Sequence, residues 1–116
     1  MEKNDFDKDE IINIINNFVS KVAEQNPKLV TAYLFGSFAK NNERSESDID
    51  IALFIDDLND EERFDLQVHL ILLATEFDIR IEPHPFSYSD FKNGNPFVLE
   101  IINTGIEIKP RTPNTV

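Results

Sequence analysis

Residues 36–54, GSFAKNNERSESDIDIALF, decide the fold, because they join a Gly-Ser turn to an Asp-x-Asp pair across ten intervening residues. The pair opens the segment DIDIALFI, whose alternation predicts a strand with two unlike faces. Asp48 and Asp50 share one face with Ala52 and Phe54, while the opposite face is wholly aliphatic. Two positions along a strand span about 6.5–7 Å, so both carboxylates can converge on one metal ion or on two adjacent ions.

Helices and strands are predicted on both sides of this stretch. Strands are predicted at 29–35, 48–55 and 77–83, with a short edge strand at 106–108. Helices are predicted at 8–25 and 38–42, within 56–77 and within 95–105. No internal repeat or low-complexity tract interrupts these elements.

The first helix has the clearest pattern. Its apolar residues, which include Ile11, Ile15 and Phe18, recur at helical spacing and form one stripe. Asp7 is a suitable N-cap, and Pro27 prevents the helix from continuing. We therefore expect this stripe to pack against the core.

The segment 56–77 fits two patterns. Phe64, Leu66 and Val68 alternate as in a strand. Asn59 is a suitable N-cap, however, and three acidic residues follow it in what would be the first helical turn. The cap, the acids and the length of the segment together favour a helix.

The segment FDIRIEP has the alternation of a half-buried strand. Phe77, Ile79 and Ile81 are predicted to face inward, with charged residues between them on the other side. Pro83 and Pro85 are predicted to end this strand, because proline cannot donate a hydrogen bond to a neighbouring strand.

Composition sets limits on function. We expect one domain at 1–108 and a flexible tail at 109–116, which has little to bury. The net charge is −11, from 22 acidic and 11 basic residues, and no basic block is present, which disfavours direct nucleic-acid binding. The chain has no cysteine, no signal peptide and no membrane-length apolar run, so a cytoplasmic location is expected.

The Gly-Ser turn has the character of an anion site. Gly36 ends a strand and lets the backbone approach a phosphate, and Ser37 adds a hydroxyl at the start of a short predicted helix. Lys40 and Arg44 follow in the loop and are candidates to neutralise a triphosphate, although each alone also fits an exposed loop cation.

This order of strand, Gly-Ser, ten residues and Asp-x-Asp resembles the DNA polymerase β-like nucleotidyltransferase superfamily, and the short chain resembles its minimal, MNT-type members. The resemblance implies an α/β (α+β) fold, with helices packed on a mixed sheet. It also implies that Gly36 and Ser37 hold the triphosphate and that Asp48 and Asp50 bind Mg²⁺. Many relatives have a second glycine shortly after the Gly-Ser pair, where this chain has asparagines.

The resemblance further implies a third carboxylate on a neighbouring strand, acting as metal ligand and base. Glu82 is the preferred candidate, and Asp78 on the same face of the predicted strand is the second. Either acid also fits an edge position, or an ion pair with Arg80. His84 is a candidate for contacting substrate.

The implied function is transfer of a nucleoside monophosphate, with AMP from ATP preferred, to an acceptor hydroxyl, using two Mg²⁺ ions. The chain leaves little room for a separate acceptor-binding domain, so a partner protein is expected to supply the acceptor or an additional binding surface. The resemblance suggests a HEPN-type partner, for which the chain would be the antitoxin. Two alternatives remain open at this point: a catalytically silent nucleotidyltransferase-like binding subunit and an unrelated acidic α/β scaffold.

Overall fold

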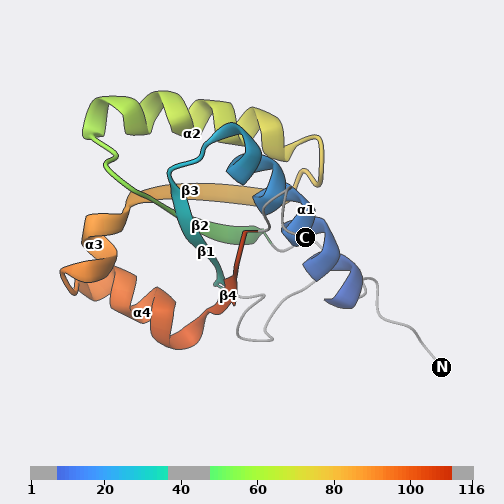
Figure 1. Cartoon of the computed structure of the whole chain (residues 1–116). Helices are drawn as coiled ribbons and strands as arrows, with labels where there is room; N and C mark the ends of the chain where they lie inside the picture. Colours follow the sequence, from blue (N-terminus) through green and yellow to red (C-terminus); the bar gives the residue numbers. More distant parts are fainter. Residues whose placement is uncertain (1–7, 37–47, 111–116) are drawn as a thin grey trace, which may run out of the picture.

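The computed structural model describes residues 8–36 and 48–110, and its centre is a mixed four-stranded sheet (Figure 1). The strands are β1 (Leu29–Phe35), β2 (Ile49–Ile55), β3 (Ile81–Ser87) and β4 (Ile106–Ile108). They lie in the order β3-β2-β1-β4. β1 is antiparallel to both β2 and β4, whereas β2 and β3 are parallel. The predicted mixed-sheet, α+β class is confirmed.

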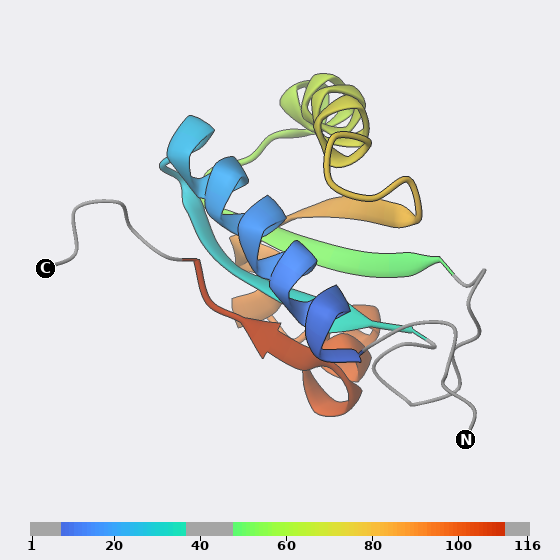
Figure 2. The same cartoon turned by 90° about the vertical axis from the view of Figure 1, so that its right-hand side faces the viewer.

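Helices cover both faces of this sheet. They are α1 (Lys8–Gln25), α2 (Asp60–Ala74), α3 (Tyr88–Lys92) and α4 (Pro96–Thr104). α1 and α2 pack on one face and α3 and α4 on the other (Figure 2). None of the helices in the described part of the chain has the length and apolar character needed to cross a bilayer.

The apolar stripe of α1 forms much of the first core. Ile11, Ile15, Phe18 and Val22 are at most 3% exposed and pack with the aliphatic residues of β2 and with α2. The predicted bounds of this helix are confirmed. Its predicted cap Asp7 lies outside the described residues, as does the short helix predicted at 38–42.

The faces of β2 follow the predicted alternation. Ile49, Ile51, Leu53 and Ile55 are all buried in the core under α1 and α2. On the opposite face, Ala52 and Phe54 are buried in a second, aromatic core with α4 residues. Asp50 precedes them on that face and is only partly buried.

Capping residues fix the starts of α2 and α4. The Asn59 side chain accepts a hydrogen bond from the backbone N–H of Glu62, and the Glu62 carboxylate accepts one from the N–H of Asn59. This capping box decides the ambiguous segment in favour of a helix, as predicted. Asn95 caps α4 and Pro96 occupies its first turn, where proline is compatible with a helix.

The bounds predicted for the third strand are wrong. β3 begins at Ile81 and continues through Pro83 and Pro85, which were predicted to end it. Ile79 belongs to the preceding turn and is 84% exposed instead of facing inward. The prolines are tolerated because β3 is an edge strand whose partner lies on one side only. The backbone carbonyl of Pro83 accepts a hydrogen bond from the Gln67 side chain in α2, so the carbonyl points away from β2.

One helix was not predicted. α3 directly follows β3, and its first turn is capped by the Ser87 side chain, which accepts a hydrogen bond from the Ser89 N–H. Its aromatic residues Tyr88 and Phe91 pack on the aromatic core. β4 is the short edge strand that the sequence predicts at 106–108.

Candidate active site

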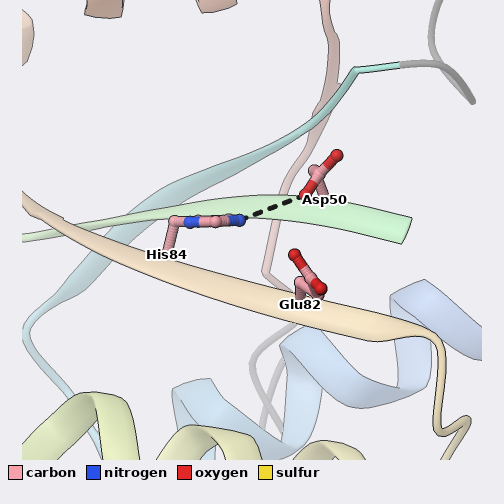
Figure 3. A group of neighbouring side chains, drawn as sticks. All are labelled: Asp50, Glu82 and His84. Carbon is pink, nitrogen blue, oxygen red and sulfur yellow. Dashed lines mark hydrogen bonds and ion pairs between the residues drawn. The ribbon is translucent and has the colours of Figure 1, made fainter. Parts of the chain in front are cut away.

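Neighbouring parallel strands bring polar side chains together at one end of the sheet. The register pairs Asp50 with Glu82 and Ala52 with His84. Because alternate residues of a strand share a face, Asp50, Glu82 and His84 all project on the face that carries the aromatic core. Figure 3 shows the Asp50 carboxylate on β2 turned toward the Glu82 and His84 side chains on β3.

These three side chains are close enough to share a ligand. The His84 Nε2 lies 3.2 Å from the Asp50 Oδ1. One ligand atom from each of Asp50, Glu82 and His84 lies within 4.8 Å of the other two. The Asp50 and His84 side chains are 25% and 35% exposed, and Glu82 is exposed. The cluster is therefore held by the sheet but remains open to solvent.

Negative charge is concentrated around Glu82. Its pKa is raised, first by partial loss of water around the carboxylate, and then by a hydrogen bond and charge from Asp48 and by the charge of Asp50. The neighbouring His84 acts in the opposite direction. Carboxylates this close repel one another unless a cation or a proton lies among them. Asp48, the exposed residue just before β2, is therefore part of the same acidic group.

Gly36 ends β1 directly against this group. Its φ is +80°, in the left-handed region that glycine adopts readily. A Cβ built on Gly36 would lie 2.5 Å from the Asp50 Oδ2, closer than any real side chain could approach. Because Gly36 has no side chain, the Asp50 carboxylate can occupy the space directly beside the turn. Ser37, Lys40 and Arg44 lie outside the described residues, so their proposed phosphate contacts stay predictions.

Asp78 is placed differently from Glu82. It lies in the turn before β3 and accepts hydrogen bonds from the Arg80 Nε at 3.0 Å and Nη2 at 2.8 Å. These bonds to Arg80 lower the pKa of Asp78. Asp78 is not among the residues that surround Asp50 in the described chain. Asp78 therefore forms the ion pair with Arg80 that the sequence analysis gave as the alternative to a metal-binding role.

The donor atoms of the cluster fit a hard divalent cation. Mg²⁺ prefers oxygen ligands and keeps positions open for substrate phosphates. Asp48, Asp50 and Glu82 offer carboxylate oxygens, and their mutual repulsion would be relieved by a cation. The His84 nitrogen is not a ligand that Mg²⁺ favours, so its contact with Asp50 suits a residue that orients the carboxylate.

A groove of about 290 Å³ leads away from the cluster between β3 and α2. It is lined by Gln67, Ile71, Ile79, Ile81, Glu82, Pro83 and His84. A larger cavity of about 470 Å³ lies at the opposite end of β2, beside Ile55 and Asp56, and includes neither Asp50 nor Glu82. Size alone therefore does not identify the site, because the larger cavity lacks the clustered ligand atoms.

The contact between His84 and Asp50 was missed by sequence reasoning, which considered His84 only as a substrate contact. The available signal was the spacing of Glu82 and His84, two residues apart on a strand. The register between β2 and β3, which brings them to Asp50, is not encoded in that spacing.

The mixed sheet presents clustered acids beside a glycine turn, which is the arrangement that the nucleotidyltransferase resemblance implied. The chain belongs to the family described as "Polymerase beta, Nucleotidyltransferase", whose model matches residues 17–114. The match covers most of the described chain and assigns it to the polymerase β-like nucleotidyltransferases. A comparison with curated proteins finds no match.

Solved structures share the fold at low sequence identity. A protein of Sulfolobus solfataricus assigned to the nucleotidyltransferases matches with a TM-score of 0.65 and 18% identity, over 94% of this chain and 88% of that one. A toxin–antitoxin structure with AMP-PNP matches with a TM-score of 0.53 and 24% identity, over 91% and 75%. A mutant of the toxin–antitoxin pair MntA–HpeT matches with a TM-score of 0.52 and 22% identity, over 91% and 75%.

Proposed function

We propose that this nucleotidyltransferase transfers AMP from ATP to a hydroxyl group of a partner protein, with Mg²⁺ as cofactor. The observation that carries the proposal is the placement of Asp50 opposite Glu82 on adjacent strands, with Gly36 against the Asp50 carboxylate. This arrangement puts a glycine bend, suited to phosphate, next to oxygens suited to a divalent cation.

Asp48, Asp50 and Glu82 are the residues that would hold the metal. Two divalent ions bound there would neutralise triphosphate charge and favour ionisation of the acceptor hydroxyl. His84 keeps Asp50 oriented through the 3.2 Å contact between the Nε2 and the Oδ1. The backbone at Gly36, with the Ser37 hydroxyl, positions the β- and γ-phosphates.

The reaction forms one bond and breaks one. The acceptor oxygen bonds to the α-phosphorus of ATP, and the bond between that phosphorus and the oxygen leading to the β-phosphate breaks. Pyrophosphate leaves with the electron pair. Glu82, which is exposed beside Asp50, accepts the proton of the acceptor hydroxyl and passes it to water. Positioning and charge neutralisation supply most of the acceleration in such transfers.

The partner is a HEPN-type toxin, with this chain as its antitoxin. Solved structures of toxin–antitoxin pairs that share this fold support a toxin as the partner, and the AMP-PNP in one of them supports an adenine nucleotide. The HEPN type of the partner rests on the sequence resemblance. Charge supports the association as well, since a chain with a net charge of −11 suits a basic partner.

Transfer of label tests this proposal. The chain is incubated with α-labelled ATP, Mg²⁺ and the purified product of the neighbouring reading frame, and label on that protein is measured. Asp48→Asn and Asp50→Asn should each reduce transfer by about a thousandfold or more, because each removes a negatively charged ligand. Asp56→Asn is the matched control, since Asp56 is an exposed acid at the other end of β2 and should leave transfer unchanged.

Two results would contradict the proposal. Transfer that is equal in wild type and in folded Asp50→Asn would place the chemistry elsewhere. Binding of the partner without transfer at any Mg²⁺ concentration would favour the catalytically silent binding subunit.

A further inference from the structure

The outer side of α2 carries an apolar stripe that the described chain leaves uncovered. Phe64, Val68, Ile71 and Leu72 are 72%, 44%, 45% and 64% exposed. They recur at helical spacing on one face, opposite the buried edge of the helix that includes Leu73. Figures 1 and 2 both show α2 at the outside of the molecule, over the β3 edge of the sheet.

This stripe continues toward the active site. Ile71 belongs both to the stripe and to the 290 Å³ groove between α2 and β3. Ile79, which is 84% exposed, lines the same groove. Glu82 and His84 line this groove as well. The Glu82 side chain projects on the other face of the sheet, so a chain seated on α2 would reach it by following this groove around the β3 edge.

Acidic residues flank the stripe. Asp60, Glu61 and Asp65 are exposed in the first half of α2, and Glu61 and Asp65 fall on the same helical face as Val68 and Leu72. The α2 cation Arg63 is paired with Asp60 at 3.6 Å. The surface thus combines exposed apolar side chains with net negative charge.

We propose that the α2 stripe (Phe64, Val68, Ile71, Leu72) and the adjoining groove dock the acceptor protein, through an apolar patch bordered by lysine or arginine. This assignment rests on the proposed transfer to a protein hydroxyl. The acceptor residue enters the groove beside Ile79 and brings its hydroxyl to Glu82. A second copy of this chain is disfavoured as occupant, because each copy carries a net charge of −11 and the two acidic surfaces would repel each other.

A double variant tests the docking surface. Phe64→Ser with Leu72→Ser removes two exposed apolar side chains, so folding should be preserved, as circular dichroism and a melting curve verify. Leu99→Ser is the matched control, because Leu99 is an exposed leucine, 43% accessible, on a helix packed on the other face of the sheet. Binding of the purified neighbouring-frame protein is measured by calorimetry at two salt concentrations.

The dissociation constant should rise at least about tenfold in the double variant and stay within about twofold in Leu99→Ser. Higher salt should weaken wild-type binding, because the flanking charges are exposed. Equal binding by the double variant would overturn the proposal. So would a wild-type dimer that the double variant converts to a monomer, because the stripe would then be covered by a second copy.

The same measurements separate this proposal from the proposed function. Asp50→Asn should bind the partner as wild type does while losing transfer. Wild-type binding without any transfer would remove the proposed function, whereas the dependence of binding on Phe64 and Leu72 would still assign the docking surface.

Discussion

The two faces of β2 have different roles, although their residues alternate along a single strand of seven residues. Toward α1 and α2 every side chain is aliphatic and at most 1% exposed. Toward α3 and α4, Ala52 and Phe54 are buried, but Asp50 near the strand's start is 25% exposed. The aromatic core ends where the acidic cluster begins, which lets one strand stabilise the fold and present carboxylates to solvent.

This difference shows how a small domain positions a charged site. The aliphatic face holds the strand in place, and the backbone register then fixes Asp50 opposite Glu82. Stability and activity should therefore respond to different residues of β2, even to sequence neighbours.

Ile51→Ala tests the aliphatic side of this comparison. Ile51 directly follows Asp50 but is fully buried on the other face. Its truncation should lower the free energy of unfolding by about 2–5 kcal/mol, through lost burial and the cavity left behind. Urea denaturation measures this loss, and AMP transfer per folded molecule should stay within about twofold of wild type. A tenfold loss of transfer with unchanged stability would break the comparison.

His84 tests the acidic side. His84→Phe keeps a ring that can pack near Phe35, whose ring centroid lies 5.4 Å from that of His84, but it removes the contact with Asp50. We expect the rate of transfer to fall about 10- to 100-fold, as for other residues that orient metal ligands. His84→Gln, whose amide can still donate to Asp50, should recover most of the rate. A rate that is kept in His84→Phe but lost in His84→Gln would assign His84 a packing role only.

Local signals explain which parts of the fold could be predicted from the sequence. The stripe of α1, the Asn59 cap of α2 and the alternation of β2 each lie within one element, so periodicity and capping identify them. Gly36 and Asp50 belong to different elements, but the family resemblance of their motif indicated a shared site, and the structure places them side by side.

The third strand could not be placed in this way. Phe77, Ile79 and Ile81 alternate like a strand, but the chain makes a turn there, and a strand with two prolines forms instead. Whether proline is tolerated depends on β3 lying at the sheet edge, which is a property of the assembled sheet. The contact between His84 and Asp50 depends on the same pairing.

Two glycines with similar backbones test how closely the turn and the acid are coupled. Gly36 and Gly94 have φ values of +80° and +76°, so Gly→Ala at either should cost about 1–2 kcal/mol of stability through strain. Only at Gly36 would the new Cβ displace Asp50, since nothing lies within 4 Å of a Cβ at Gly94. Transfer should therefore fall in Gly36→Ala and remain in Gly94→Ala. Similar activity of the two variants would contradict the coupling.

Substitution of Asp78 should have the smallest effect of these changes. It compares a carboxylate that stabilises the fold with the carboxylates of the acidic cluster. Its bonds to Arg80 lower its pKa below the ordinary value of 3.8, so they stabilise the fold above that pH, and the contribution is lost as the pH falls through the lowered pKa. Asp78→Asn should reduce the free energy of unfolding at pH 7 by about 1 kcal/mol and leave transfer unchanged. The difference from wild type should shrink below about pH 4. Loss of transfer in this variant would instead make Asp78 part of the site.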